Sequence, residues 1–367
     1  MTENRYKIDM FYGKSLEGNP LGSPVERKIN VYLPPGYFED QTKRYPAIYF
    51  LHGYSSNDKS WTVTSDESPD KAIDWNIIPK KILQRIDVDR LLTFEKLDAL
   101  ILDGKLDPFI LIQPDGSLEV PNIHNRKDLR GNVTTKGSFY VNSPHSGNYM
   151  DYILKDVIGY IDSNYRTIAD SSHRALMGGS MGGFGTLYLA IHHPEQFKTI
   201  VALSPGNHSD LEMMTTWKLK IPIYTEIFGD KMSTEIGDYA WGDIIDTYDL
   251  IYSNDNRLLP SIKRDEEGKI VDYNKEAYQK WQNYELIHLL EKHPNSLKDL
   301  HLQINCHTRD EFGLTQVTEE IHRKLQSLKI DHEYELYSDE AALLTPHILG
   351  IGYRILPGIE HCLKFIK

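Results

Sequence analysis

The hydrophobic pattern of this chain changes between two periods, which predicts strands interleaved with helices. Residues 28–34 alternate apolar and polar positions, as a half-buried strand does. Residues 46–52 and 108–113 are continuous apolar runs, as expected for strands that are buried on both faces. Residues 149–165 instead repeat apolar side chains three and four positions apart, which predicts an amphipathic helix.

The same alternation continues further along the chain. We expect strands at 174–177, 198–203, 301–305 and 332–337, and helices at 183–192 and 314–328. The last twenty residues predict an apolar helix that is interrupted at Pro357. This order of elements predicts the α/β class, with a mostly parallel central sheet flanked by helices on both faces.

Two stretches, 62–100 and 207–297, do not fit this alternation. The length of 367 residues suits one large α/β domain, so we interpret both stretches as cap-like insertions in a single domain, 1–367. The second stretch contains the aromatic residues Trp217, Tyr224, Trp241 and Trp281. These side chains either line an acyl or aromatic pocket or pack the insertion onto the body, and the sequence favours neither interpretation.

The charge balance argues against two classes of partner. The chain has 41 basic and 53 acidic residues, so its net charge of −12 does not attract nucleic acid or an anionic membrane surface. No stretch approaches the ~20 apolar residues of a membrane span. The first residues do not form a basic segment followed by an apolar run, so we expect no secretory signal and a cytoplasmic location. In that compartment Cys306 and Cys362 are expected to be free thiols.

The motif that carries chemistry is Gly178-Gly179-Ser180-Met181-Gly182. This G-x-S-x-G sequence lies between an apolar strand and a helix with small residues, which is the context of a nucleophile elbow. The tight corner exposes the Ser180 hydroxyl and requires small neighbours. The helix that begins there directs the N–H of Met181 towards the position of an oxyanion. No Lys follows the glycines, which excludes a Walker-type phosphate loop.

A serine nucleophile needs a base and an acid that orients it, in the chain order Ser, acid, His. Asp310 is the expected acid because it follows a late strand, and Glu311 is the alternative one residue later. His347 is the expected base because it lies between the last predicted strand and the last helix. His361 lies deep in that helix, and His332 begins a strand, which is the wrong edge of the sheet for a site.

The loop after the strand at 46–52 is expected to supply a second oxyanion donor, the backbone N–H of Tyr54. His52 precedes this loop, and we interpret it as a structural residue that packs beneath it. The sequence contains neither H-E-x-x-H nor a paired C-x-x-C motif, so no metal is expected. No cofactor is expected either, because the nucleophile, base and acid are all side chains.

Several segments besides the elbow occur together in a known family. They are residues 15–61, QPDG at 113–116, residues 137–167 and TRDEFGL at 308–314. With them the chain resembles the putative-esterase family, which includes feruloyl-esterase-like enzymes and the catalytic domains of enterochelin esterases. The resemblance implies an α/β-hydrolase fold and hydrolysis of a small-molecule ester, feruloyl or short-chain acyl, through an acyl-enzyme. It matches Ser180 to the nucleophile and Asp310 to the acid, and His347 falls where the base is expected.

The chain departs from the family pattern in two places. His307 stands where the family often has Gly, and His347 lies between Pro346 and Ile348 instead of between Gly and an aromatic residue. Two other functions use the same sequence features: acyl transfer to an alcohol by the same triad, and ligand binding by a hydrolase fold that has lost catalysis. The sequence leaves the oligomeric state open, a homo-oligomer included.

Overall fold

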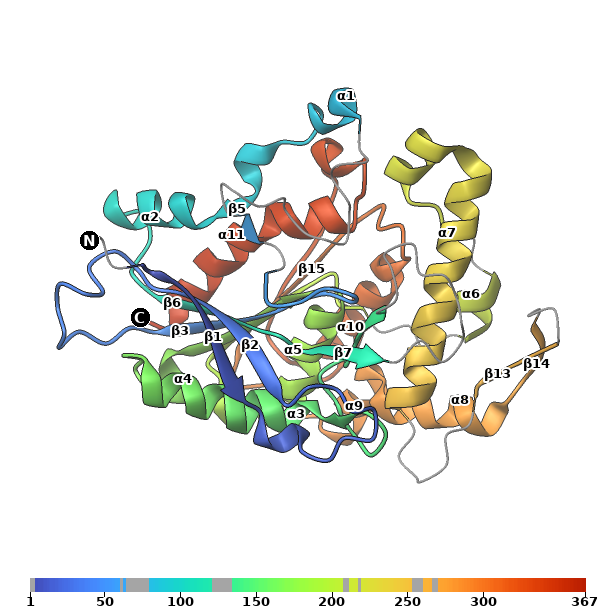
Figure 1. Ribbon diagram of the computed structural model, residues 1–367, viewed down its shortest axis with the longest axis horizontal. Helices are drawn as coiled ribbons and strands as arrows, with labels where there is room; N and C mark the ends of the chain where they lie inside the picture. Colours follow the sequence, from blue (N-terminus) through green and yellow to red (C-terminus); the bar gives the residue numbers. More distant parts are fainter. Residues whose placement is uncertain are drawn as a thin grey trace.

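The computed structural model describes residues 4–59, 62–63, 79–120, 134–206, 211–216, 219–252, 260–265 and 270–367. Its centre is an eight-stranded sheet (Figure 1) with the order β1-β2-β6-β3-β11-β12-β15-β16. Strand β2 runs antiparallel to both of its neighbours, β1 and β6, and the other adjacent pairs are parallel. The strands are β1 (Tyr6–Tyr12), β2 (Glu26–Tyr32), β3 (Ala47–Leu51), β6 (Ile110–Pro114), β11 (Arg174–Gly179), β12 (Thr199–Leu203), β15 (His301–His307) and β16 (Glu333–Tyr337).

The predicted strands are all present, with ends that differ by no more than two residues. The sequence analysis missed the edge strand β1. Its side chains Ile8, Met10 and Tyr12 form one face and are 53–54% exposed, whereas Phe11 on the other face is buried. Lys7 and Asp9 alternate with Ile8 and Met10, but the apolar face is the one turned to solvent, contrary to the rule for a half-buried strand.

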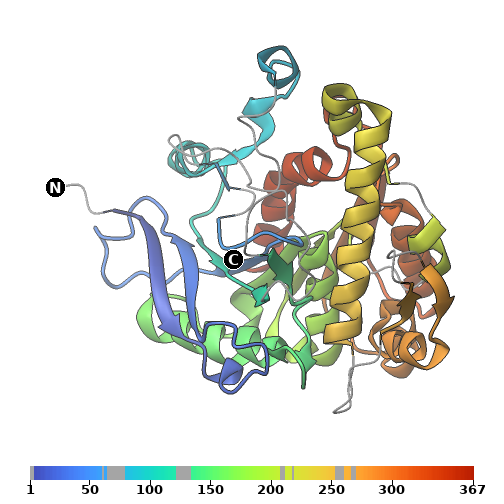
Figure 2. The ribbon, with the colours of Figure 1, turned by 45° about the vertical axis from the view of Figure 1, so that its right-hand side comes forward.

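Helices cover both faces of the sheet (Figures 1 and 2). In β3 the side chains alternate: Tyr49 and Leu51 face one helical layer, and Ile48 and Phe50 face the other. The first layer is α3 (Tyr149–Asp151), a π-helical turn (Tyr152–Val157), α4 (Ile158–Asn164), α5 (Met181–His192), α9 (Leu286–Lys292) and α10 (Leu314–Ser327). The second layer is α2 (Phe94–Leu102) and α11 (Ile348–Phe365). This arrangement confirms the predicted α/β class.

The two stretches outside the alternation contain further short elements and one long helix. The helix α7 (Pro222–Ile251) is kinked at Gly229, whose φ of 82° and ψ of 168° are not helical. It packs beside α6 (Leu211–Thr216) and α8 (Lys275–Trp281) (Figure 1). The remaining elements are β4 (Thr62–Val63), α1 (Lys80–Leu83), β5 (Leu92–Thr93), β7 (Ser117–Val120), β8 (Thr134–Gly137), β9 (Asn142–Ser143), β10 (Gly147–Asn148), β13 (Ile262–Arg264) and β14 (Ile270–Tyr273). Helix α2 lies in the first stretch, yet it buries Phe94, Leu97 and Ile101 against the sheet.

The expected interruption of the last helix at Pro357 is wrong. Helix α11 continues through Pro357, which lies on its exposed side. A proline removes one backbone hydrogen bond, but the buried side of the helix packs too tightly to separate. At Gly358 an added Cβ would lie 3.0 Å from Met177 Cε and 3.2 Å from Val201 Cγ1, on the strands β11 and β12. Contact with the sheet therefore outweighs the lost hydrogen bond.

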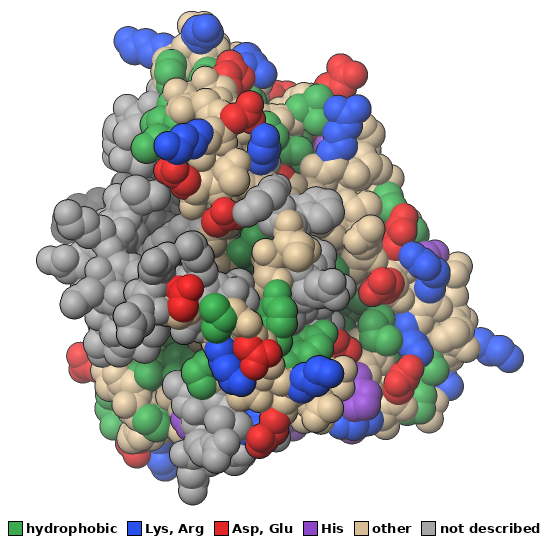
Figure 3. Space-filling model, turned by 90° about the vertical axis from the view of Figure 1, so that its right-hand side faces the viewer, with side chains coloured by type: hydrophobic (Ala, Val, Ile, Leu, Met, Phe, Trp, Pro, Cys, Tyr) green, Lys and Arg blue, Asp and Glu red, His purple; other side chains and the backbone are tan. Residues whose placement is uncertain are grey.

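Membrane-spanning helices, the two cysteines and the surface charges were also the subject of expectations from the sequence. Among the described residues, none of the helices combines the length and the apolar character that a membrane crossing requires. Cys306 and Cys362 are buried, free thiols, as predicted. On the face that carries α7, Lys and Arg side chains are interspersed with Asp and Glu side chains (Figure 3).

Candidate active site

Ser180 lies at the sharp corner between β11 and α5. Its φ and ψ of 58° and −121° are in a region that residues with a Cβ rarely adopt. Three backbone hydrogen bonds hold this conformation: the Ser180 N–H donates to Leu203 O at 2.9 Å, and the Ser180 carbonyl accepts from Phe184 at 3.0 Å and Gly206 at 2.9 Å. The strained corner predicted from the motif is therefore present and fixed on both sides.

The glycines of the motif are required by close backbone contacts. An added Cβ at Gly182 would lie 2.0 Å from Leu51 O, at the end of β3. At Gly178 it would lie 2.4 Å from the carbonyl of Gly182 itself. Strand and helix approach so closely that no other residue fits at either position without a backbone shift.

Asp310 and His347 are in direct contact. The Nδ1 of His347 lies 2.7 Å from Asp310 Oδ2, and the other carboxylate oxygen accepts the N–H of Phe312 at 3.0 Å. Both side chains are buried. Burial alone would raise the pKa of Asp310, but the charge and hydrogen bond of His347 outweigh it, so this pKa is lowered. Burial alone would lower the pKa of His347, but the Asp310 carboxylate raises it above the usual value.

Glu311, the alternative acid, makes contacts of a different kind. Its Oε2 accepts the backbone N–H of His347 at 2.7 Å, and its Oε1 accepts the hydroxyl of Thr345 at 2.6 Å. Burial and the neighbouring Asp310 charge raise the pKa of Glu311 to about 7. The carboxylate that touches the imidazole is that of Asp310, whereas Glu311 fixes the main chain that carries it.

The first turn of α11 packs against the nucleophile corner. An added Cβ at Gly179 would lie 2.6 Å from Ile351 Cγ2. The N–H of Ile351 donates to the carbonyl of His347 at 3.0 Å, so the two residues are one helical turn apart. This contact brings the helix that begins after His347 against the residue that precedes Ser180.

The side chains of Tyr54 and Met181, whose backbone N–H groups are the expected oxyanion donors, meet at Gly137. An added Cβ there would lie 2.1 Å from Met181 Sδ and 2.8 Å from Tyr54 Cδ2. Met181 is the first residue of α5, where N–H groups point out of the helix. Tyr54 follows β3 in a turn in which Ser56 donates to the carbonyl of Gly53 at 3.3 Å. The loop and the helix start are thus adjacent.

The other histidines have different environments. The N–H of Gly116 donates to His52 Nε2 at 2.9 Å, and Nδ1 lies 2.8 Å from Gly53 O, which confirms the structural role predicted for His52. His361 is buried in α11, 3.2 Å from a Glu333 oxygen. His332 Nε2 lies 2.8 Å from the ring of His322.

His307, which departs from the family pattern, stabilises the start of the Asp310 loop. Its Nδ1 accepts the N–H of Arg309 at 2.9 Å, and its Nε2 lies 3.2 Å from Asp339 O. The imidazole therefore replaces the flexibility of a glycine with two specific contacts to main-chain groups.

Trp281 and Trp241, in the second stretch at 207–297, both have packing contacts. Trp281 packs against Tyr248 and donates its indole N–H to Asp249 at 3.2 Å, which joins α8 to α7. Trp241 packs against Phe312 with ring centres 5.9 Å apart, and the Phe312 ring lies 4.8 Å from that of His347. Trp217 lies outside the described residues.

Sequence analysis missed a buried polar group around Tyr54, formed by Lys136, Asp243 and Thr247. The Tyr54 hydroxyl lies 2.7 Å from Asp243 Oδ2 and 2.6 Å from Thr247 Oγ1. Lys136 Nζ lies 2.8 Å from Asp243 Oδ1. No sequence motif links positions 189 residues apart, so only the folded chain reveals this cluster.

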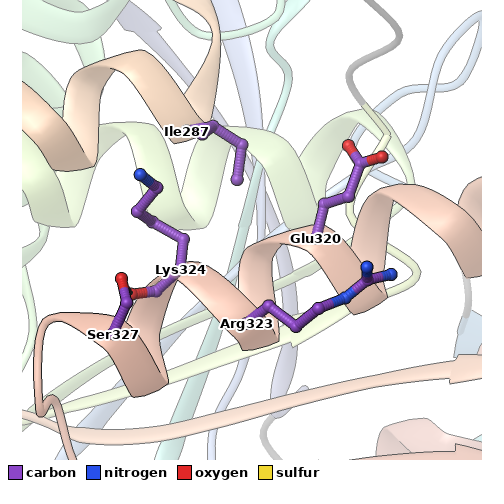
Figure 4. Close-up of a pocket in the computed structure, with 5 residues that line it drawn as sticks. All are labelled: Ile287, Glu320, Arg323, Lys324 and Ser327. Atoms are coloured by element: carbon purple, nitrogen blue, oxygen red, sulfur yellow. Dashed lines mark hydrogen bonds between the residues drawn. The ribbon is translucent and has the colours of Figure 1, made fainter.

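A pocket of about 330 Å³ lies elsewhere, between α9 and α10 (Figure 4). Its lining residues are Ile287, Glu320, Arg323, Lys324 and Ser327. None of them belongs to the candidate site. Within the described part of the chain, no group of three or more His, Cys, Asp or Glu side chains is placed to hold a metal ion.

Comparison with known proteins places these features in context. The family model described as "Putative esterase" matches residues 23–338. An endo-1,4-beta-xylanase/feruloyl esterase of Xylanibacter ruminicola is 29% identical over 50% of this chain and 20% of its own length. An S-formylglutathione hydrolase of Mus musculus is 24% identical over 52% of this chain and 56% of its own length. The chain thus matches only part of each of these relatives.

Solved structures resemble the whole described fold. A ferulic acid esterase aligns with a TM-score of 0.55 at 17% identity, and the alignment covers 96% of both chains. An S-formylglutathione hydrolase from Staphylococcus aureus aligns with a TM-score of 0.50 at 16% identity, covering 96% of this chain and 98% of its own. These similarities confirm the α/β-hydrolase fold.

Proposed function

Because the chain belongs to the putative-esterase family, we propose that it is a serine hydrolase that cleaves carboxylic esters through an acyl-enzyme. The observation that carries this proposal is the 2.7 Å contact between His347 and Asp310. His347 directly precedes α11, and the first turn of that helix packs against the Ser180 corner. Nucleophile, base and acid come from separate elements in the chain order that such sites use.

The proposed reaction begins with proton transfer. His347 takes the hydroxyl proton of Ser180, and the Ser180 oxygen attacks the ester carbonyl. The N–H groups of Tyr54 and Met181 stabilise the negative oxygen, and each such donor typically lowers the barrier by about 2.7–4 kcal/mol. His347 then gives its proton to the leaving alcohol. Water then loses a proton to His347 and attacks the acyl carbonyl. His347 returns this proton to the Ser180 oxygen as the carboxylic acid leaves.

Asp310 orients the base and stabilises its charged form. The Asp310 carboxylate accepts a hydrogen bond from the Nδ1–H of His347. The proton of the neutral imidazole is then on Nδ1, so Nε2 is unprotonated and able to accept the serine proton. The raised pKa of His347 makes it a stronger base than a free imidazole. The tautomer is inferred from these contacts.

The substrate proposed is a small ester with a feruloyl or short-chain acyl group. The relatives support these two classes, since their names include a feruloyl esterase and an S-formylglutathione hydrolase. We assign the choice of acyl group to the insertion at 207–297, because its Trp241 reaches His347 through Phe312. A panel of p-nitrophenyl esters of increasing chain length, assayed beside methyl ferulate, separates the two classes.

Replacement of the nucleophile tests the proposal. Ser180→Ala is expected to lower turnover of p-nitrophenyl acetate by about 10⁴–10⁶ and to abolish labelling by a fluorophosphonate probe. Ser172→Ala removes a hydroxyl that bonds to Asp170 on the surface, so this control should retain wild-type turnover. Wild-type rates in Ser180→Ala would refute the assignment. Added acceptor alcohols reveal transfer if they yield new esters.

A further inference from the structure

The loop that carries Tyr54 is anchored to the long helix of the second insertion. The Tyr54 hydroxyl lies 2.7 Å from Asp243 Oδ2 and 2.6 Å from Thr247 Oγ1, both on α7. Burial raises the pKa of Tyr54 well above its usual value, so its phenol remains protonated and donates to the Asp243 carboxylate. A hydrogen bond to a charged acceptor is roughly twice as strong as one between neutral groups.

The charge of Asp243 is balanced within the same cluster. Lys136 Nζ lies 2.8 Å from Asp243 Oδ1, and the two side chains are only 10% and 17% exposed. Thr247 donates its hydroxyl to the Asp243 carbonyl at 2.8 Å, one turn earlier on α7. An ion pair shielded from water in this way is screened little by salt, so it holds Asp243 in one position.

The anchored loop needs such support, because its backbone is strained. Ser55, the residue after Tyr54, has a φ of +54°, which costs a residue with a Cβ of order 1 kcal/mol or more. The Tyr54 ring itself packs 5.9 Å from that of Phe139, which in turn lies 4.9 Å from Tyr248 of α7. The hydroxyl of Tyr54 therefore contacts α7 directly, and its ring is connected to α7 through Phe139.

We propose that Asp243 is a positioning residue that holds the backbone N–H of Tyr54 for oxyanion binding, through the hydrogen bond between its carboxylate and the Tyr54 hydroxyl. This inference rests on the proposed function. It assigns to the insertion a part in the chemical step, in addition to contact with the substrate. Since the anchor acts on a group that matters most in the transition state, its loss lowers kcat and leaves KM nearly unchanged.

Tyr54→Phe is the direct test, because it removes only the anchoring oxygen and keeps the ring and the main chain. We expect kcat for p-nitrophenyl acetate to fall about 10- to 100-fold with KM within threefold. The affinity for a trifluoromethyl ketone, which forms an oxyanion on the serine, should fall by the same factor. Asp243→Asn keeps an acceptor for Tyr54 but loses the pair with Lys136, so a smaller loss is expected.

Tyr160→Phe is the matched control. The Tyr160 hydroxyl also bonds to an aspartate, Asp9 Oδ2 at 2.9 Å, but at the edge strand β1. This variant should keep the wild-type kcat. Thermal unfolding of all variants, measured beside the kinetics, separates anchoring from a general loss of stability.

Defined results overturn the inference. It is wrong if Tyr54→Phe and Asp243→Asn keep kcat and ketone affinity within twofold of wild type, or if KM alone rises. It is also wrong if kcat falls only at temperatures where the variants unfold. Wild-type protein that neither hydrolyses esters nor labels at Ser180 would instead refute the proposed function, which keeps the two failures distinct.

Discussion

Asp310 and Glu311 are adjacent acids, but replacing each by its amide should change kcat by very different amounts. In the wild-type structure Asp310 Oδ1 accepts the N–H of Phe312 at 3.0 Å. In Asp310→Asn, only the amide oxygen can still accept this hydrogen bond. If the amide oxygen takes that place, the NH₂ group faces His347 Nδ1 and donates to it. Nδ1 then loses its hydrogen and Nε2 carries it, so the base can no longer accept the serine proton.

The magnitude follows from the contact distance. At 2.7 Å and an effective dielectric constant of about 20, the attraction between the imidazolium and the carboxylate is at most about 6 kcal/mol. Since each 1.36 kcal/mol changes a rate tenfold, the loss in kcat is about 10³–10⁴. The wrong tautomer acts on the same step, so its effect is contained in this figure.

Glu311→Gln should be nearly silent in comparison. Its amide oxygen can accept the N–H of His347, and its NH₂ group can donate to the hydroxyl of Thr345, which rotates to accept. We expect a change in kcat of less than tenfold. Stopped-flow measurement of acylation by p-nitrophenyl acetate, with circular dichroism to check folding, compares the variants. A loss of 10³ or more in Glu311→Gln, with Asp310→Asn within tenfold of wild type, would refute the reasoning.

Two further predictions concern pH and packing. In the proposed mechanism the neutral form of His347 is the base, and the pKa of His347 is raised, so kcat/KM should fall as pH drops through a midpoint above ~6.5. A pH–rate profile with a lower midpoint would contradict this. In urea unfolding, Gly182→Ala should destabilise by about 1–3 kcal/mol or more, because its Cβ would lie 2.0 Å from Leu51 O. Gly159→Ala on α4 meets open space and should stabilise by roughly 0.5–1 kcal/mol, and equal shifts in both variants would be inconsistent with these contacts.

Local chemistry explains what the sequence could predict. The apolar run at 46–52 gave β3 to within one residue at each end, because a strand buried on both faces needs apolar side chains at every position. The corner at Ser180 was predictable because close backbone contact at Gly178 and Gly182 admits no side chain. Asp310 follows β15, and strand ends are positions that a periodic pattern locates.

Features that depend on distant contacts were not predictable in the same way. Hydrophobic periodicity does not separate Asp310 from the adjacent Glu311, and only the folded chain shows that the Asp310 carboxylate is the one at the imidazole. Pro357 remains helical because of packing on β11 and β12, which no local rule contains. The contact between Tyr54 and Asp243 joins a loop to a helix that the sequence pattern left unassigned.

Helix α11 is the last element of the chain, and the candidate site is complete only when this helix is in place. It follows all eight strands of the central sheet in the chain, and its buried side chains seal one face of that sheet. His347 lies directly before this helix, so in the proposed mechanism it can act as the base for Ser180 only after the helix has docked. A chain in which α11 has not yet docked has a nucleophile without a base and an open hydrophobic face. Recovery of ester hydrolysis during refolding would therefore report the last docking step rather than the formation of the sheet.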